Sequence, residues 1–304
     1  MWTRIFGYDL GRAHGAGPLR ARYFGQADLP RLRAAGLSTV VLSIATNPTR
    51  RRGSRTATLL GNLERLQQMI STSTAASAGP TVHLAVQGGN AFDSADDVRL
   101  VPAGSLLRVT LMHLTDSFLG ATSSPLGRSR GRGGLTPPGR AMVESLAERR
   151  ILIDLAHASR QTFFDALDVL DRCPGALPPI VSHTGVSGAH RSWRNLDDDQ
   201  IRAIADRGGV IGIMYHRGFL GRPFWTVGAE DIVRHLEHTI AVGGEGVAAL
   251  GSDWDGMIVT PRDMPTCLEL PVLAEKMVAR HWPDGRIRKV LGGNALRLID
   301  AART

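Results

Sequence analysis

The sequence predicts an α/β protein of the TIM type, a (β/α)8 barrel whose first strand is missing from this chain. Short apolar runs alternate with helix-like stretches, and such runs are typical of parallel strands that are buried on both faces. Five runs end at a polar residue that can do chemistry, as the strands of such barrels do at their carboxyl ends. The expected strands begin at residues 39, 82, 108, 151, 179, 210 and 247.

A closed barrel of this type needs eight strands, and the regular order after residue 39 indicates that the first strand is the absent one. The only apolar fragment before residue 37 lies near Ile5 and Phe6. Either the first strand is hidden there, or the chain as given begins downstream of it. Residues 1–304 are predicted to form a single barrel domain, since α/β barrels of this length commonly fold as one unit.

Helices are expected between the strands. Thr136 precedes Pro137 and Pro138, which reads as a helix cap followed by first-turn prolines. Stretch 116–137 is rich in Gly, Ser, Arg and Pro, and its length predicts a lid or substrate loop. Other helical patterns lie at 31–35, 59–70, 163–170, 196–207, 232–240, 270–280 and 284–300.

The composition excludes several classes of protein. The net charge is +8, but the arginine clusters at 50–55 and 128–132 lie among Gly and Ser without interleaved aromatic residues, so no nucleic acid is expected. No stretch approaches the ~18 apolar residues of a membrane span, and the first residues lack a signal-peptide core. Cys173 and Cys267 are too few for a disulfide framework, which favours a cytoplasmic location.

Three histidines and one aspartate follow predicted strands and suggest a shared metal site. His157 and His183 end neighbouring strands, where two neutral imidazoles could bind one zinc ion, with His113 beside them. The alternative is that each ring is a hydrogen-bonded histidine near the barrel rim. Asp253, in the segment GSDWDG, could bind metal or act as a general base. The alternative is that these aspartates only form a turn. That interpretation fits Asp255, which Gly256 follows, better than it fits Asp253.

Two further residues are candidates for the site. Arg194 could hold a substrate carboxylate through two hydrogen bonds, or could form a surface salt bridge within the acidic run 197–199, and the sequence favours neither. Gln87 follows another strand and could be a weak metal ligand through its side-chain oxygen. Because this amide is neutral, it cannot bridge two cations as a carboxylate would.

Taken in order, several motifs resemble the renal, or membrane, dipeptidase family, whose members are metal-dependent barrels of the amidohydrolase type. The resemblance runs from about residue 27 to the end of the chain. It rests on GLTPPGRAMVESLAERRILIDLAHAS (134–159), IVSHT (180–184), RNLDDDQIRAIADRGGVIGI (194–213), ALGSDWDG (249–256) and IRKVLGGNALRLI (287–299).

The resemblance implies roles for five residues. In that family two zinc ions share a hydroxide that attacks the peptide carbonyl of a dipeptide. His157 and His183 match the two histidines of one zinc ion, and Asp253 matches the aspartate that moves the proton. His113 matches the histidine that polarises the scissile carbonyl. Arg194 matches the arginine that holds the dipeptide carboxylate.

Two departures from the family pattern affect the metal prediction. The bridging glutamate of an E-G-G-H motif is replaced here by Gln87 in Q-G-G-N, and no His-x-Asp occurs near the amino terminus. His14 does not fit that motif, because Gly15 and Ala16 follow it. The sequence therefore leaves one zinc ion as plausible as two.

The leading hypothesis is a zinc-dependent hydrolase of dipeptides or similar short amides with a free carboxylate. Deacylation of N-acyl amino acids in the same barrel is an alternative, since barrels change substrate through their loops. A metal-depleted protein that only binds small molecules is another. The expected partner is a small-molecule substrate, and a homodimer is left open.

Overall fold

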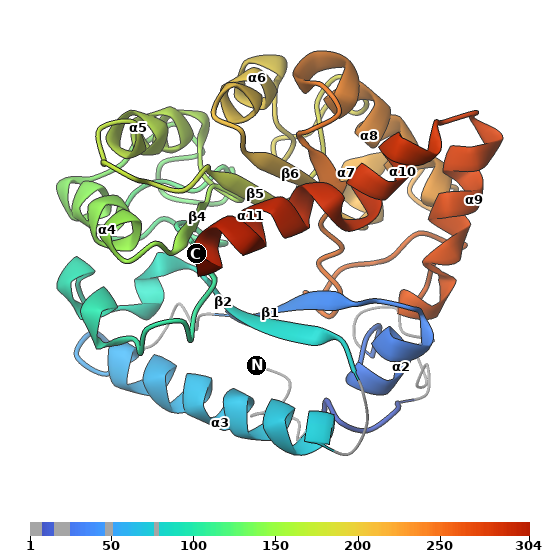
Figure 1. Cartoon of the computed structure of the whole chain (residues 1–304). Coiled ribbons are helices and arrows are strands. Elements are labelled where there is room, and N and C mark those ends of the chain that lie inside the picture. The colour runs from blue at the N-terminus through green and yellow to red at the C-terminus, as the bar shows by residue number, and fades with distance from the viewer. Residues whose placement is uncertain (1–7, 15–24, 46–50, 76–78) are drawn as a thin grey trace.

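All seven apolar runs form strands, and the strands pair in parallel in a single curled sheet in the order β1 to β7 (Figure 1). The computed structural model describes residues 8–14, 25–45, 51–75 and 79–304, so the apolar fragment near Ile5 and Phe6 lies outside the described residues. Each strand starts within one residue of its predicted position. The strands are β1 (Thr39–Ala45), β2 (Thr81–Gln87), β3 (Arg108–Thr110), β4 (Leu152–Asp154), β5 (Ile180–Thr184), β6 (Val210–Ile213) and β7 (Ala248–Leu250).

The sheet is open between its first and last strands. Among the described residues β1 pairs only with β2, and β7 pairs only with β6. Over the described residues the architecture is therefore an α/β barrel with one strand fewer than the eight of a closed TIM barrel. A cavity of about 1420 Å³ extends along the opening and is lined by residues of both edge strands. We call this opening the seam.

The predicted helices are present, with some changed boundaries. Thr136 caps its helix as expected, accepting a hydrogen bond from the Gly139 amide. The helix expected at 284–300 is interrupted by a π-helical turn, η4 (Lys289–Gly293). The α-helices are α2 (Leu29–Ala34), α3 (Arg55–Ala75), α4 (Pro137–Glu148), α5 (Arg160–Leu170), α6 (Asp198–Asp206), α7 (Arg217–Leu220), α8 (Ala229–Gly243), α9 (Pro271–Ala279), α10 (Asp284–Arg288) and α11 (Asn294–Arg303). Short 3-10 turns are η1 (Gly89–Ala91), η2 (Ala95–Leu100) and η3 (Cys267–Glu269).

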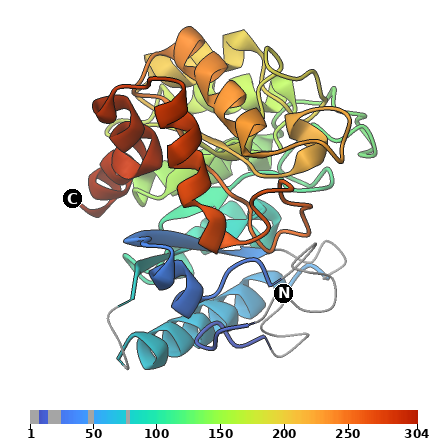
Figure 2. The same cartoon turned by 90° about the vertical axis from the view of Figure 1, so that its right-hand side faces the viewer.

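Helices cover the outside of the sheet. Helix α3 lies below β1 and β2, whereas α4, α5, α6 and α8 surround the other strands (Figures 1 and 2). Apolar side chains of α4 such as Met142, Val143 and Leu146 are fully buried in the main core. The carboxyl ends of the strands are thereby held at one rim, where the predicted site residues follow them.

Stretch 116–137, the predicted lid or substrate loop, lies beside the cavity-lining residues without lining the cavity itself. None of its residues lines the cavity. The Asp116 carboxylate accepts hydrogen bonds from the backbone of Thr122 and Ser129 and from the Ser129 hydroxyl, which fix the loop on itself. The stretch also bonds to the His157 carbonyl through the Thr122 hydroxyl, and its role as a lid or substrate loop stays a prediction.

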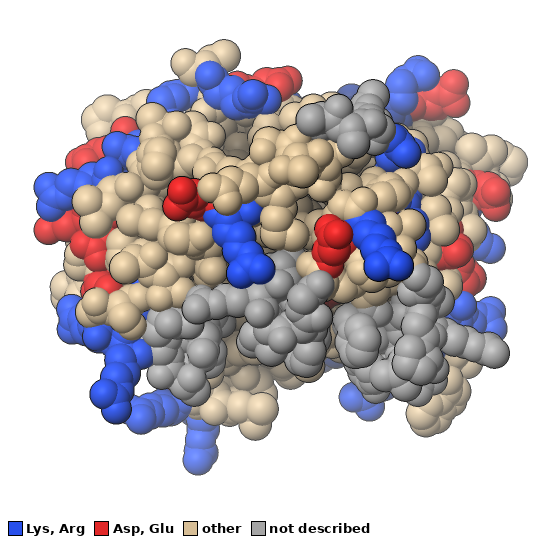
Figure 3. Space-filling view, turned by 90° about the horizontal axis from the view of Figure 1, so that it is seen from below, with Lys and Arg blue, Asp and Glu red and all other residues tan. Residues whose placement is uncertain are grey.

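The described surface has charged side chains of both signs. Basic and acidic side chains are both scattered over the face drawn in Figure 3. Within the described ranges, no helix has the length and apolar character needed to cross a bilayer.

Candidate functional site

The structure brings the three predicted histidines together. His157 follows β4 and His183 lies in β5, and their Nε2 atoms are 2.8 Å apart. The ring of His113, which follows β3, lies with its centroid 5.1 Å from that of His157. His157 is 9% exposed and His183 is 3% exposed, so the pair lies at the buried end of the cavity. Adjacent parallel strands place these residues at one rim, as the sequence predicts.

The environment keeps these imidazoles neutral. Burial, reinforced by the nearby Arg194 guanidinium, holds the pKa of His157 and of His183 well below the ordinary value. Burial and Arg194 also lower the pKa of His113 to about 4. A neutral imidazole has a lone pair available for a metal ion. Two such Nε2 atoms that face each other are therefore suited to binding one cation between them.

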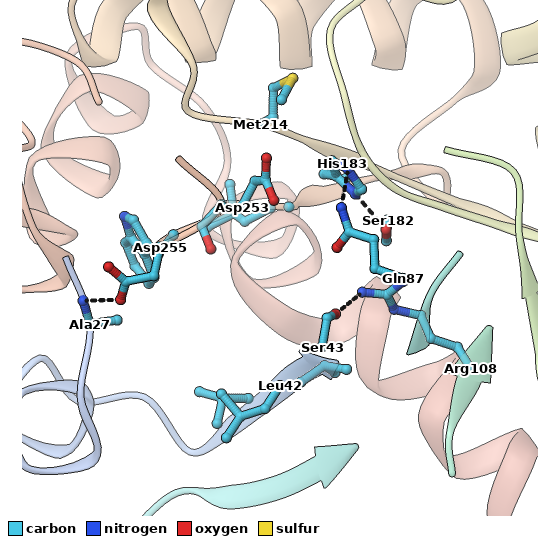
Figure 4. A pocket seen from close by; sticks show the side chains of 18 of the residues that line it. Ala27, Leu42, Ser43, Gln87, Arg108, Ser182, His183, Met214, Asp253 and Asp255 are labelled. Carbon is cyan, nitrogen blue, oxygen red and sulfur yellow. Dashed lines mark hydrogen bonds between the residues drawn. The ribbon is translucent and has the colours of Figure 1, made fainter. Parts of the chain in front are cut away.

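The side chain of Gln87, at the end of β2, lies next to the two histidine Nε2 atoms. Its side-chain nitrogen lies 3.4 Å from His183 Nε2 (Figure 4). The described part of the chain contains no cluster of three or more His, Cys, Asp or Glu side chains arranged to hold a metal ion. Two imidazoles and a neutral amide fit a single zinc ion with open positions. They provide no carboxylate to hold a second cation.

Arg194 lies inside the cavity and not on the surface. It is 3% exposed, and its Nη2 donates a hydrogen bond to the His183 carbonyl at 2.7 Å. The acidic residues Asp197 and Asp199 pair instead with Arg160. The surface salt bridge considered from the sequence is therefore wrong for Arg194. Its buried Nε atom has no hydrogen-bond partner among the described residues, which suits a binding group for an anionic substrate.

Asp253 follows β7 and faces the cavity (Figure 4). Burial raises the pKa of its carboxyl to about 7, although the charges of Arg194 and Arg108 oppose the shift. A carboxyl group that titrates near neutral pH is suited to accepting and returning a proton. Asp255 has a structural role instead, because its carboxylate accepts hydrogen bonds from the backbone of Gln26 and Ala27.

Two of the site residues have left-handed backbone conformations. The φ angle is +65° at His157 and +59° at Asp253. Residues other than glycine rarely have a positive φ angle, and those that do are often found at functional sites. Hydrogen bonds from the Ser123 amide and the Thr122 hydroxyl to the His157 carbonyl hold that residue in place.

The sequence reasoning missed a group of polar residues next to the site, of which Asp154 and Arg108 are buried and Ser182 lines the cavity. Asp154 in β4 is fully buried, and it forms an ion pair with Arg108 of β3. Ser182 bonds to both Asp154 and His183. The signal that could have revealed them is the occurrence of charged residues within otherwise apolar strands, since a charge is rarely buried without a partner.

We compared the chain with protein families, with individual relatives and with solved structures. The sequence profile of the membrane dipeptidase family (peptidase family M19) matches residues 17–304. A Klebsiella pneumoniae protein described only as an uncharacterized protein in the pqqA 5′ region is 31% identical over 169 residues, or 55% of this chain. The match spans 60% of the length of that relative.

Solved structures are similar in fold. A metallopeptidase from Rhodobacter sphaeroides, liganded with a phosphinate mimic of the dipeptide L-Ala-D-Ala, matches with a TM-score of 0.79 and 21% identity, covering 91% of this chain and 90% of that one. The probable dipeptidase PvdM from Pseudomonas aeruginosa matches with a TM-score of 0.74 and 16% identity, covering 91% and 89% of the two chains. At these identities the likeness concerns the fold alone.

Proposed function

Since the chain belongs to the membrane dipeptidase family, we propose that it is a zinc-dependent hydrolase of dipeptides or similar short amides with a free carboxylate. The observation that supports this most is the convergence of two neutral histidines, a buried arginine and an aspartate in one cavity. The dipeptide mimic in the Rhodobacter sphaeroides structure supports a substrate of this size. We further propose that residues 1–304 act as one barrel unit.

His157 and His183 would hold one zinc ion through their Nε2 atoms, with Gln87 as a weak third ligand. Bound zinc would supply an activated water and polarise the amide carbonyl. The two histidines are neutral at physiological pH because burial holds their pKa values low, so protons compete little with the cation.

Three other residues would act on the substrate. Arg194, with its unpartnered Nε, would bind the free carboxylate. His113 would donate a hydrogen bond to the scissile carbonyl oxygen. Asp253 would accept a proton from the attacking water and deliver it to the leaving nitrogen, since its pKa of about 7 allows both states.

The open seam bears on the number of metal ions. We propose that the strand absent from the sheet is the first barrel strand, whose place is between β1 and β7. A second zinc ion would need ligands that the described residues do not provide, and a strand in the seam would end at the rim between Ala45 of β1 and Asp253 after β7. The described residues therefore favour one zinc ion.

The alternatives differ in substrate or in chemistry. An N-acyl amino acid also has a free carboxylate for Arg194 and an amide for hydrolysis, so the same residues would serve a deacylase. The neutral Gln87 favours a protein that binds a small molecule without turnover. For each of these possibilities we expect a small-molecule partner and a cytoplasmic location. A homodimer is compatible with all of them.

Metal analysis together with a substrate screen tests the proposal. Purified protein is loaded with Zn²⁺, dialysed, and assayed for bound zinc and for hydrolysis of dipeptides and N-acyl amino acids. One equivalent of zinc with release of amino acids from dipeptides supports the proposal. Cleavage of N-acyl amino acids alone favours the deacylase, and folded protein without zinc or turnover favours the binding protein.

A further inference from the structure

A buried carboxylate connects the strand ends that precede the two histidines. Asp154 Oδ1 accepts hydrogen bonds from the backbone amides of Ala156 at 3.0 Å and Ser182 at 2.9 Å. These amides belong to the segments that continue to His157 and to His183. One carboxylate oxygen therefore fixes the spacing between the two segments.

The other oxygen of Asp154 accepts hydrogen bonds from three side chains. Oδ2 accepts from Arg108, from the Thr110 hydroxyl at 2.5 Å and from the Ser182 hydroxyl at 2.6 Å. Arg108 also donates to Ser43 of β1 at 2.8 Å (Figure 4). Burial alone would raise the pKa of Asp154, but the charges of Arg108 and His183 and the hydroxyl donors hold it below the ordinary value. The Asp154 carboxylate is therefore ionised and accepts every one of these hydrogen bonds.

The Ser182 hydroxyl determines which nitrogen of His183 holds the proton. A serine hydroxyl has one proton, and Ser182 donates it to the Asp154 carboxylate, which can only accept. The contact of 2.8 Å between Ser182 Oγ and His183 Nδ1 must then be donated by the histidine. His183 consequently has its proton on Nδ1 and a free lone pair on Nε2.

Contacts on the other side of the ring agree with this assignment. His183 Nε2 faces His157 Nε2 at 2.8 Å and the Gln87 amide nitrogen at 3.4 Å. An amide nitrogen only donates, so it suits an acceptor at Nε2. The Gln87 contact therefore agrees with this tautomer, and the His157 contact fits it when His157 has its own proton on Nε2.

We propose that Asp154 is a positioning residue that acts through Ser182 to keep His183 in the Nδ1-protonated tautomer, with Nε2 directed at the cavity. Asp154 itself does not reach the cavity. The effect on the tautomer is a property of the metal-free chain. Only its consequence for zinc binding depends on the function proposed above.

The alternative role for Asp154 is purely structural, as the partner of a buried arginine. Replacing Asp154 would leave Arg108 buried without its counter-charge, and the variant could fail to fold for that reason alone. Ser182→Ala is the sharper change, because it interrupts the connection to His183 and leaves the ion pair intact. Thr110→Val is the matched control, since it removes another hydroxyl donor to the same Oδ2 atom without touching His183.

The test measures the imidazole nitrogens of metal-free protein labelled with ¹⁵N-histidine, by long-range ¹H–¹⁵N correlation NMR. The His183 signals, assigned by their loss in His183→Ala, are expected to show a protonated Nδ1 and a bare Nε2. Ser182→Ala should move His183 toward the other tautomer, whereas Thr110→Val and Ser182→Thr should leave it unchanged. An unchanged tautomer in Ser182→Ala, or an equal change in Thr110→Val, would overturn the proposal.

Zinc titration gives a second readout. Ser182→Ala is expected to weaken Zn²⁺ binding by about 10- to 100-fold, the usual effect of losing a hydrogen-bond partner behind a metal-ligating histidine. Thr110→Val should bind Zn²⁺ as the unaltered protein does. If the unaltered protein binds no Zn²⁺, the proposed function fails, while the NMR result still decides the role of Asp154.

Discussion

Strands β1 and β4 are both apolar, but only β4 is enclosed. All three residues of β4 are buried, and β4 pairs with a strand on each side. In β1, the run TVVLSIA is half-buried at most positions, with only Ile44 buried. The difference arises from position in the sheet, since β1 is an edge beside the seam. Apolar composition therefore predicts that a strand forms, but not that both of its edges are covered.

The histidines of the site lie at the ends of enclosed strands, whereas the seam is bordered by an edge strand. His157 follows β4 and His183 lies in β5, both of them enclosed strands, and hydrogen bonds around Asp154 hold the segments of the two histidines. The seam, by contrast, exposes Val41 and Leu42 to the cavity. The predictions below examine this contrast, and they begin with the largest expected effect.

Zinc binding should depend on the enclosed side. We expect His157→Ala and His183→Ala each to abolish zinc uptake, a loss of at least about 100-fold in affinity, because one imidazole and a neutral amide are a weak ligand set. His83→Ala in β2 is the control, since His83 does not line the cavity. Zinc content is measured after dialysis by atomic emission. Unchanged zinc content in both variants would contradict the proposed site.

Leucine truncation should distinguish the two strands. Leu152 in β4 is 1% exposed, so Leu152→Ala should lower the free energy of unfolding by about 2–5 kcal/mol. Leu42→Ala in β1 removes a half-buried side chain beside the cavity and should cost about 1 kcal/mol. Urea unfolding measures both. Equal losses would mean that the seam is covered in solution, and the contrast between the strands would be lost.

Asp253, where the seam meets the site, should affect stability in a pH-dependent way. Its pKa is about 7 in the folded chain and about 4 when unfolded. Its stabilising contribution is therefore complete below about pH 4 and is lost as the pH rises through 7. Asparagine does not titrate, so the Tm of Asp253→Asn relative to the unaltered protein should rise from pH 4 to pH 8, on the order of 5–10 °C for a shift of this size.

The buried histidines titrate in both proteins, so their contribution cancels in this difference. A Tm difference that is constant with pH would show that the Asp253 carboxyl has an ordinary pKa. In the zinc-loaded protein we expect Asp253→Asn to retain the metal but lose turnover, which is measured with the best dipeptide from the screen. Normal turnover would exclude Asp253 as the proton carrier.

Much of the site was predictable because strand order places polar residues at a common rim. His113, His157, His183 and Asp253 line the same cavity, as their positions at the ends of apolar runs predicted, and Arg194 lines it too. Asp154 and Ser182 were not found, because they lie within strands and their importance depends on contacts across β3, β4 and β5. The burial of Arg194 was equally undecided, since its acidic neighbours in sequence pair with Arg160.

The sequence by itself determined the seven strands, most of the helices and the identity of the residues that meet at the rim. These features depend on local periodicity, caps and strand order, which are encoded in neighbouring residues. Only the tertiary structure decided that β1 and β7 remain apart over the described residues, that Arg194 is buried in the cavity, and that one carboxylate bonds to the segments of both histidines. Those outcomes depend on pairings between residues distant in sequence, for which no local pattern exists.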